Sequence, residues 1–383
     1  MSCVAARVQS AFLESFGARP AHLVRAPGRV NLIGEHTDYS GGFAMPLALE
    51  QAVWIAFRPR RDRRLLLHSL DYGETCELDL GRPLRGAGGW QEYLKGIVWV
   101  LAESGRRLCG WEGVLAGDVP RGAGLASSAA LEVALARVFV ELSGLPWEAR
   151  VFAERVQRAE NEWVGVRCGI LDPLASACGV AGHVLRIDCR SLAVEPLPFP
   201  SQVRLLALDT ATRRGLIDSA YNERRAQCET VARSFDRSQL RDVGFEELLE
   251  GAGMLEPRLF RRARHVLGEN RRVEESADAL RADDYQRLGT LMQRSHESLR
   301  DDFEVSSPAL DAIVEAALET PGCLGARMTG AGFGGCAVAL VETGEASDFA
   351  LALPEAYRRR TGLEAKIYPC TPSAGAECLG PSP

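Results

Sequence analysis

The segment from Arg25 to Tyr39 constrains the fold more than any other, because it begins as a strand that cannot be regular. Two glycines and one proline interrupt its apolar run, and the run ends in four consecutive polar or charged residues. Glycines within a strand indicate close approach by another backbone or by a ligand. Polar side chains crowded at a strand end favour hydrogen bonding to something other than the core. Taken alone, the segment also fits a strand that runs into a solvated turn.

Length and composition are those of an ordinary globular protein. At 383 residues, the chain suggests two or three domains of roughly 150 residues each. A net charge of −6, with no basic cluster apart from acidic residues, argues against a nucleic-acid partner. No apolar run reaches the roughly 18 residues of a membrane helix, and the first residues lack the layout of a signal peptide. We therefore expect a cytoplasmic protein without a membrane partner.

The cysteines and histidines show no metal-binding or disulfide pattern. The eleven cysteines are scattered and form no CxxC pair, and the six histidines form no HExxH motif. This argues against a disulfide framework, a zinc site and a dedicated transition-metal site. We expect the cysteines to be reduced and mostly buried as small hydrophobic residues.

The order of strand and helix patterns predicts two α+β lobes rather than one wound parallel sheet. Strand patterns dominate the first 120 residues, and a long helical region is predicted from about Leu216 to Arg300. The proline-bearing segment Val194–Pro200 is the best candidate for a link, which gives domains over 1–195 and 200–370. Three prolines and two glycines predict that the tail Thr371–Pro383 is disordered.

A second glycine-rich segment, Pro120–Glu132, follows a predicted strand and opens an alanine-rich helix. Small residues let backbone N–H groups crowd around an anion, and the helix N-terminus adds unpaired donors. The hydroxyl groups of Ser127 and Ser128 fit either a helix cap or, for one of them, a ligand of phosphate-bound Mg²⁺. Because the segment has no Gly-Lys-Ser/Thr, it is not a Walker-type P-loop.

A third glycine-rich segment, Gly325–Gly335, lies between two predicted strands. It holds four glycines within six residues, and ordering them costs backbone entropy. Close approach to a phosphate or a sugar explains this composition better than a packed turn does. A glycine-rich hairpin stays the alternative for the segment taken alone.

The three segments together, in this order and spacing, resemble the GHMP kinase superfamily, and within it the galactokinase branch. GRVNLIGEHTDY resembles the galactokinase signature, and further similarity lies in AENEWVGVRCGILD, IDCRSL, SAYNERRAQCE, RARHVLGEN and SHESLRDDFEVS. The resemblance implies a two-lobed α+β fold with the active site in the cleft between the lobes. It also implies an ATP- and Mg²⁺-dependent kinase that phosphorylates the anomeric C1 hydroxyl of α-D-galactose. Its partners would be the sugar and ATP, and the protein would be a monomer or a weak homodimer.

The resemblance gives Asp172 the role of catalytic carboxylate, with Arg29 as its partner. Phosphoryl transfer to a sugar needs a hydroxyl that is oriented and relieved of its proton, and a cation that stabilises the spreading phosphoryl charge. Arg29 would hold Asp172 ionised and would also touch the transferred phosphate.

The resemblance also assigns the sugar-binding residues. Asp38 would accept hydrogen bonds from the ring hydroxyls, while Glu35 and His36 would hold the exocyclic end. Tyr221 and the backbone at Gly169 would complete the pocket. A buried polar partner for each hydroxyl rejects epimers, because the wrong sugar leaves a partner unsatisfied.

Nucleotide and metal positions follow from the same resemblance. Ser128 and Glu160 match the Mg²⁺ ligands, and two protein oxygen ligands are a typical number for Mg²⁺. Trp90 falls where the family places an aromatic residue near adenine, although a tryptophan that opens an amphipathic helix is as often part of the core. The other expected cofactor-binding positions are Gly122, Gly124, Ser127 and Gly332.

The chain departs from the family pattern at three positions. Pro173 stands where glutamine is usual, Ala126 replaces the first of three serines, and Ser307 replaces a cysteine. Pro173 matters most, because it removes an amide next to Asp172 and restrains the backbone there. It leaves the preferred sugar in doubt without removing a group that phosphoryl transfer needs.

Two alternatives to a galactose kinase therefore stay open. One is a kinase for a related sugar, such as N-acetylgalactosamine, L-arabinose or a uronic acid. Glu35 argues against an acidic sugar if it contacts the exocyclic group, because two carboxylates repel. The other is a non-catalytic sensor of galactose and ATP. The residues expected for catalysis are all present, which argues against a sensor: Arg29, Asp172, Ser127 and Ser128.

Overall fold

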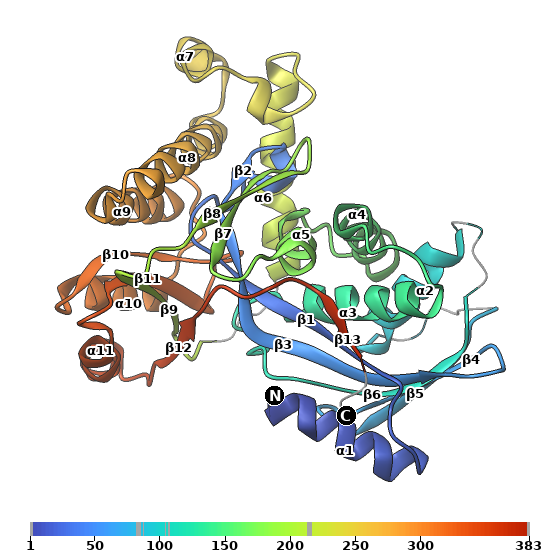
Figure 1. Cartoon of the computed structure of the whole chain (residues 1–383). Coiled ribbons are helices and arrows are strands. Elements are labelled where there is room, and N and C mark those ends of the chain that lie inside the picture. The colour runs from blue at the N-terminus through green and yellow to red at the C-terminus, as the bar shows by residue number, and fades with distance from the viewer. Residues whose placement is uncertain are drawn as a thin grey trace.

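A six-stranded sheet forms the frame of the N-terminal half (Figure 1). The computed structural model describes residues 3–81, 86, 88–103, 105, 108–212 and 217–380, and of 217–219 only the backbone. The strands of this sheet lie in the order β13–β1–β3–β6–β4–β5, and only β4 and β6 run parallel. Their bounds are β1 His22–Asn31, β3 Pro46–Pro59, β4 Arg64–Ser69, β5 Glu74–Asp79, β6 Trp111–Gly117 and β13 Glu377–Leu379.

Helices cover both faces of this sheet because its central strands are apolar on both sides. Side chains alternate between the faces of a strand. In β3, Ala52, Trp54 and Ala56 therefore pack against the first helix, while Val53, Ile55 and Phe57 belong to the main core on the other face. Figure 1 shows α1 on one side of the sheet and α2 to α5 on the other. These helices are α1 Cys3–Phe16, α2 Gln91–Glu103, α3 Ser127–Leu142, α4 Ala149–Ala159 and α5 Leu171–Cys178.

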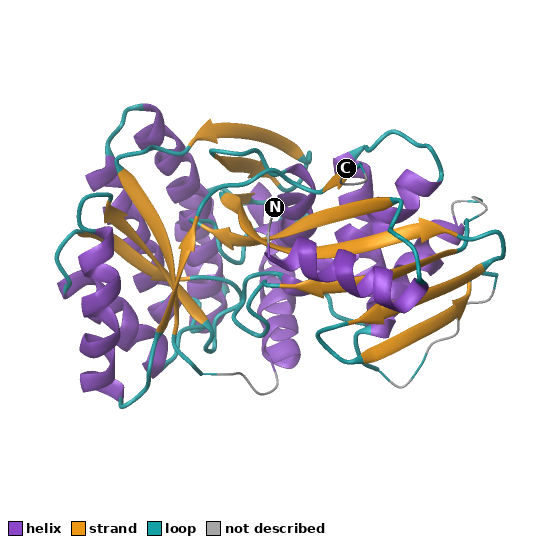
Figure 2. Ribbon diagram, turned by 60° about the horizontal axis from the view of Figure 1, so that its bottom comes forward, coloured by secondary structure: helices purple, strands orange, loops and turns teal. Residues whose placement is uncertain are grey.

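The C-terminal half is built on a second, antiparallel sheet with the order β10–β11–β9–β12. Figure 2 shows the two sheets on opposite sides of the molecule, with helices beside each. The strands are β9 Val203–Asp209, β10 Cys323–Met328, β11 Cys336–Glu342 and β12 Lys366–Cys370. The helices are α6 Ile217–Ser234, α7 Phe245–Glu250, α8 Pro257–Arg281, α9 Tyr285–Asp301, α10 Pro308–Glu319 and α11 Ala346–Thr361.

These elements confirm an α+β fold. The predicted helical region contains α6 to α9, although Leu216 itself lies outside the described residues. No described helix is both long enough and apolar enough to cross a membrane.

The predicted link Val194–Pro200 is wrong over most of its length. A third, three-stranded sheet has the order β2–β7–β8, and β8 (Ala193–Pro198) occupies its edge beside β7 (His183–Asp188). The first strand, β2, is Phe43–Ala44. An edge strand tolerates proline, because one side of its backbone needs no ladder partner. The chain passes to the C-terminal sheet only between Pro198 and Val203.

The prediction of a disordered tail is also wrong for Thr371 to Gly380. Residues 377–379 form β13, which pairs with β1 and returns the end of the chain to the N-terminal sheet. Just before it, Ser373 Oγ and the carbonyl oxygen of Ala374 accept hydrogen bonds from the buried Arg25 guanidinium, at 3.0 Å and 2.9 Å. The tail is ordered because it satisfies this buried cation. Pro381–Pro383 lie outside the described residues.

We predict that ending the chain after Cys370 lowers the free energy of unfolding by about 2–5 kcal/mol, because Arg25 stays buried and loses two of its acceptors. Denaturant unfolding of the truncated and full chains measures the difference. Removal of Pro381–Pro383 alone is the matched control and should change nothing measurable. Equal stability of the two truncations would contradict a structural role for the tail.

Candidate active site

The register of β1 with β3 shifts between Pro27 and Arg29, where β3 bulges and its residues 49–51 lie opposite Gly28. A Cβ atom at Gly28 would lie 2.7 Å from the carbonyl oxygen of Leu125 and 2.8 Å from Cγ1 of Val119. The same carbonyl accepts a hydrogen bond from the Arg29 amide at 3.1 Å. Close approach at this glycine is therefore confirmed, and the approaching group is the glycine-rich loop before α3.

Strand β1 presents Arg29 to Asp172. The Arg29 Nε and Nη2 atoms lie 2.9 Å and 2.7 Å from Oδ1 of Asp172, and Nη1 donates to the carbonyl oxygen of Gly124 at 2.6 Å. The arginine thus joins β1, the glycine-rich loop and α5. Both contacts use Oδ1, so Oδ2 of the 31%-exposed Asp172 side chain stays available to a ligand.

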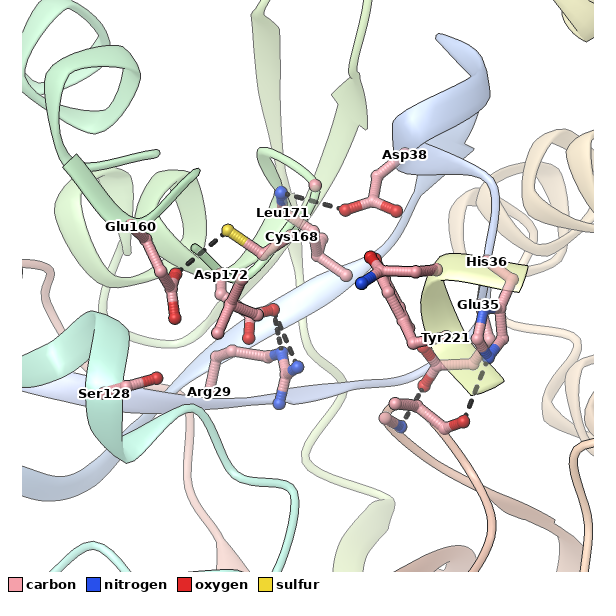
Figure 3. A pocket seen from close by; sticks show the side chains of 15 residues that line it. Arg29, Glu35, His36, Asp38, Ser128, Glu160, Cys168, Leu171, Asp172 and Tyr221 are labelled. Carbon is pink, nitrogen blue, oxygen red and sulfur yellow. Dashed lines mark hydrogen bonds and ion pairs between the residues drawn. The ribbon is translucent and has the colours of Figure 1, made fainter. Parts of the chain in front are cut away.

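A cavity of about 250 Å³ opens beside this pair (Figure 3). Figure 3 shows Arg29, Asp172, Glu160 and Ser128 toward one side, with the remaining labelled polar residues toward the other. Both halves of the chain contribute, since Tyr221 comes from α6. The complete lining is Arg29, Glu35, His36, Asp38, Ser128, Glu160, Val166, Cys168, Gly169, Leu171, Asp172, Tyr221, Asn222, Gly330 and Ala331.

Asp38 and Gly169 fit each other closely. A Cβ atom at position 169 would lie 1.7 Å from Oδ2 of Asp38, so any side chain there would displace the carboxylate. The amides of Tyr39 and Leu171 donate to this carboxylate at 3.0 Å and 3.4 Å. Burial, and next the charge of Asp172, raises the pKa of Asp38 to about 6. Asp38 therefore titrates close to neutral pH.

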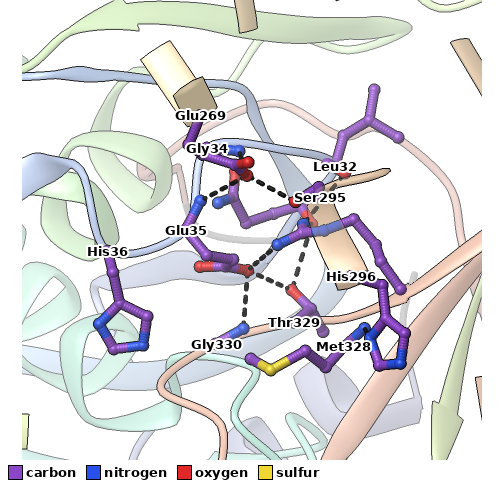
Figure 4. Close-up of polar contacts among 12 residues, drawn as sticks. Leu32, Gly34, Glu35, His36, Glu269, Ser295, His296, Met328, Thr329 and Gly330 are labelled. Atoms are coloured by element: carbon purple, nitrogen blue, oxygen red, sulfur yellow. Dashed lines mark hydrogen bonds and ion pairs between the residues drawn. The ribbon is translucent and has the colours of Figure 1, made fainter. Parts of the chain in front are cut away.

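Glu35 is held by the third glycine-rich segment (Figure 4). Its Oε1 accepts from Thr329 Oγ1 at 2.9 Å and from the Gly330 amide at 2.7 Å, and lies 3.5 Å from Nη2 of Arg327. Each of these contacts uses Oε1. The second oxygen, Oε2, is the one that can face the cavity.

His36 uses both ring nitrogens inside the protein. Nε2 lies 3.2 Å from the carbonyl oxygen of Ala331, which only accepts, so Nε2 carries the hydrogen. Nδ1 then accepts from the Tyr39 hydroxyl at 2.9 Å. The ring also packs against those of Tyr221 and Phe303, at centroid distances of 5.6 Å and 4.8 Å. The ring lies in the wall of the first cavity, and its expected contact with a sugar stays a prediction.

A buried carboxylate on α8, Glu269, holds the same loop from behind. Its Oε1 accepts from the amides of Gly34 and Glu35 at 3.0 Å and 3.3 Å and from Ser295 Oγ at 2.6 Å, while Oε2 accepts from Arg272. Burial alone would raise the pKa of Glu269, but Arg272, followed by nearby His265 and Arg327, holds it well below its usual range. Glu269 is therefore ionised at any working pH.

Two further buried side chains hold this loop from the C-terminal half. Burial lowers the pKa of His265 to about 4, so its neutral ring donates from Nε2 to the carbonyl oxygen of Glu35 at 3.1 Å. Arg327 donates to the carbonyl oxygens of Asn31 and Leu32 at 3.2 Å and 3.1 Å. The sequence predicted none of these supports, although Glu269 and His265 lie in the RARHVLGEN block and Arg327 in the third glycine-rich segment.

A second cavity of about 310 Å³ adjoins the first, since Ser128 lines both. Trp90 lines it with only 4% of its surface exposed, stacks on Tyr72 at 5.9 Å and donates from Nε1 to Glu74 at 3.0 Å. Trp90 is thus both a core residue and part of a cavity wall. The lining is Val53, Asp71, Tyr72, Trp90, Tyr93, Leu115, Gly117, Val119, Arg121, Gly122, Ser127, Ser128 and Leu131.

The helix-cap explanation for the two serines is wrong. The N-cap of α3 is Ala126, which has a left-handed φ of 58° and makes no side-chain cap. Ser127 and Ser128 are the first two helical residues, and both line the second cavity. Their hydroxyls stand at a helix N-terminus, where unpaired amides and the helix dipole favour an anion.

A group of oxygen atoms beside Ser128 fits a divalent cation. Glu160 lines the first cavity where α4 widens into the π-helical turn Glu160–Val164, and its Oε2 accepts from Cys168 Sγ at 2.9 Å. One helical turn after Ser128, Glu132 is fully buried, and neither carboxylate oxygen has a hydrogen-bond partner in the part of the chain that the structure describes. Burial and the charge of Glu160 raise the pKa of Glu132 well above its usual range. Hydroxyl and carboxylate oxygens are the ligands that Mg²⁺ prefers, so this donor set suits it.

Of the three glycines predicted to bind the cofactor, one lines a cavity. Gly122 lines the second cavity, whereas Gly124 acts through its carbonyl oxygen on Arg29. Gly332 is packed against Val305, whose carbonyl oxygen a Cβ atom would meet at 2.2 Å. It lines neither cavity within the described residues. Asn222 lines the first cavity and was not predicted, although it follows Tyr221 directly in the chain.

The three departures from the family pattern are not among the residues that line either cavity, although Pro173 directly follows Asp172 and Ala126 directly precedes Ser127. Pro173 is the third residue of α5, in the first turn, where a backbone N–H would have no helical partner. Ala126 is buried ahead of α3. Ser307 caps α10 by accepting from the Leu310 amide at 3.3 Å.

Comparisons with known proteins show the family of this chain. The galactokinase galactose-binding signature matches residues 10–59, and the GHMP kinase N-terminal and C-terminal domains match 92–180 and 276–359. A galactokinase of Chloroflexus aggregans is 43% identical over 378 residues, which cover 97% of each chain. The crystal structure of Lactococcus lactis galactokinase complexed with galactose superposes with a TM-score of 0.93 at 33% identity, over 97% of this chain and 98% of that one.

More distant structures share the fold alone. The mevalonate kinase of Methanococcus jannaschii is 19% identical, with a TM-score of 0.65 over 92% of this chain and 99% of that one. The signature match and the near full-length identity decide between the branches of the superfamily. This chain belongs to the galactokinase family of the GHMP kinases.

Proposed function

We propose that this galactokinase transfers the γ-phosphoryl group of ATP to the anomeric C1 hydroxyl of α-D-galactose, which gives galactose 1-phosphate and ADP. The observation that carries the proposal is the Arg29–Asp172 ion pair, at 2.7 Å, beside the junction of the two cavities. The first cavity would take the sugar, and the second would take the nucleotide.

Asp172 would orient the attacking hydroxyl and accept its proton. Its Oδ2 is available, because both contacts from Arg29 use Oδ1. The anomeric hydroxyl is more acidic than an ordinary alcohol, so a carboxylate can accept its proton without a strongly raised pKa. Arg29 would keep Asp172 ionised and add positive charge near the transferred group.

Polar groups on the opposite wall would recognise the sugar. Asp38 would accept from ring hydroxyls, and Oε2 of Glu35 would accept from the exocyclic hydroxyl. Asn222 lines the same cavity, and its buried Oδ1 has no hydrogen-bond partner in the described part of the chain. An epimer that fails to pair with these groups leaves them unsatisfied, which lowers its affinity.

The charge of the first cavity argues against a uronic acid as substrate. Four carboxylates line it, from Glu35, Asp38, Glu160 and Asp172, against the guanidinium of Arg29. A fifth carboxylate on the ligand would meet this excess of negative charge. A sensor without catalysis is disfavoured because the ion pair is formed and both serines line the nucleotide cavity.

Ser128 and Glu160 would hold Mg²⁺ in this proposal, with Glu132 close behind. The bound cation would supply positive charge that neutralises the phosphate oxygens. ADP release from ATP and Mg²⁺, measured across a panel of free sugars, tests the whole proposal. Turnover with galactose but not with N-acetylgalactosamine, L-arabinose or galacturonate is expected, and no turnover with any sugar would sink the proposal.

We predict that Asp172→Asn lowers kcat by about 10²–10⁴-fold, because the amide cannot accept the hydroxyl proton. Calorimetry should show galactose and nucleotide binding close to that of the unchanged protein. Asp348→Asn, an exposed position on α11, is the matched control. Retained turnover in the Asp172 variant would mean that another group accepts the proton.

Galactose affinity should depend on the ionisation of Asp38. Since its pKa in the folded protein is raised to about 6, the accepting carboxylate is complete above that pH and lost as the pH falls through it. We predict that the Kd for galactose, measured by calorimetry without nucleotide, rises about tenfold from about pH 7 to about pH 5.

The matched variant is Asp38→Asn, which should bind galactose weakly at every pH with a flat profile. A profile of unchanged slope in this variant would show that another group titrates.

We predict that Glu269→Gln raises the KM for galactose about tenfold or more and leaves the KM for ATP unchanged. A glutamine side chain has only one acceptor oxygen. It cannot accept hydrogen bonds both from Arg272 and from the amides of Gly34 and Glu35, as the two carboxylate oxygens do. Asp278→Asn, on the same helix with a 65%-exposed side chain, is the control. Equal changes in both KM values would indicate general loss of structure rather than loss of loop positioning.

A further inference from the structure

Three side chains with metal-binding atoms meet on the N-terminal sheet, away from both cavities. The Nδ1 or Nε2 atom of His22, a carboxylate oxygen of Glu141 and Sγ of Cys378 all lie within 4.8 Å of one another. His22 begins β1 seven residues before Arg29, roughly 20 Å from it at the rise of a strand. None of the three lines the sugar or nucleotide cavity.

The three residues come from separate elements of regular structure. His22 lies on β1, Glu141 in the last turn of α3 and Cys378 in the middle of β13. They are far apart in the sequence and show no motif spacing, which explains why spacing alone argued against a transition-metal site. Pairing of β13 with β1 brings Cys378 opposite Val24, within reach of the other two.

Neighbouring residues hold two of these side chains in place. The His22 ring stacks on that of Phe57 at 5.2 Å with an interplanar angle of 24°. Arg137 lies 3.2 Å from Oε2 of Glu141, so the other oxygen, Oε1, turns toward His22 and lies 4.0 Å from its Nδ1. Such outer contacts orient the ligands of a metal and restrict their rotamers.

We propose that His22, Glu141 and Cys378 bind one Zn²⁺ ion, with water as the fourth ligand, and that this ion fastens the C-terminal strand β13 to β1 and α3. Imidazole nitrogen, thiolate sulfur and carboxylate oxygen are the three ligand types that zinc takes in proteins. At the usual metal–ligand lengths of about 2.0–2.3 Å, tetrahedral ligand atoms lie about 3.5 Å apart. To reach that separation, the 4.0 Å between His22 and Glu141 must shrink by about half an ångström. The two distances to Cys378, each at most 4.8 Å, must shrink by about 1.3 Å or less.

Binding would have two consequences. The Cys378 thiol gives its proton to the solvent as the zinc–sulfur bond forms. Because the three ligands come from three elements, the ion would bind the folded chain far better than the unfolded one, and stability would rise with zinc concentration. The site would thus secure the same tail that covers Arg25.

The experiment uses the full chain, freed of metal by a chelator, with Zn²⁺ as the ligand and Co²⁺ as a spectroscopic probe. Equilibrium dialysis should find one Zn²⁺ per chain. Co²⁺ should give the near-ultraviolet charge-transfer band of a thiolate ligand, together with the intense visible bands of a tetrahedral site. Saturating Zn²⁺ should raise the thermal midpoint by about 3 °C or more and slow amide exchange in residues 377–379.

Cys378→Ser should lose the charge-transfer band and weaken Zn²⁺ binding at least tenfold, and Glu141→Gln should weaken it without loss of the band. Cys109→Ser, which removes an exposed cysteine elsewhere, is the control and should bind like the unchanged protein. Absence of a thiolate band in the unchanged chain, or equal binding by Cys378→Ser, would overturn the proposal.

Discussion

The structure depends most on one buried carboxylate, that of Glu269, because it holds the loop on which the candidate site is built. Oε1 of this carboxylate accepts hydrogen bonds from the amides of Gly34 and Glu35, and Arg272 balances its negative charge. The loop belongs to the N-terminal half, whereas α8 and the third glycine-rich segment belong to the C-terminal half. A buried ion is tolerated only when it is paired and fully hydrogen-bonded. The two halves must therefore stay together for the loop to keep its shape.

The same strand then serves two purposes, because β1 bears Arg29 and leads directly to Glu35 just beyond its end. Because both residues are attached to this stiff strand, Arg29 of the proposed catalytic pair stays at a fixed distance from Glu35 of the proposed sugar-binding wall. Asp38 and Gly169 add a steric condition, since a side chain at 169 would displace the carboxylate. Elements of regular structure hold these groups, and such support gives a site its precision.

Much of this arrangement was predictable, and the failures have physical reasons. The three glycine-rich segments were found because glycine is needed where backbones approach, as at Gly28 beside Leu125. The tail was misjudged because proline and glycine predict local flexibility but do not show that Arg25 needs acceptors from residues 373 and 374. Glu269 was missed because a single glutamate on a helix has no local signal of burial. The meeting of His22, Glu141 and Cys378 was missed because the three are far apart in the sequence and show no motif spacing.

The sequence by itself determined local properties: the mixture of strand and helix patterns, where glycine permits close packing, and to which family the signature points. These follow from side-chain alternation and backbone sterics, which act over a few residues. Only the tertiary structure decided which distant groups meet, such as Arg29 with Asp172 or β13 with β1. It also decided that Pro173 lies in the first turn of α5, directly after Asp172 and outside both cavity linings. Such contacts depend on how whole helices and strands pack together, and the spacing of residues in the sequence does not predict that packing.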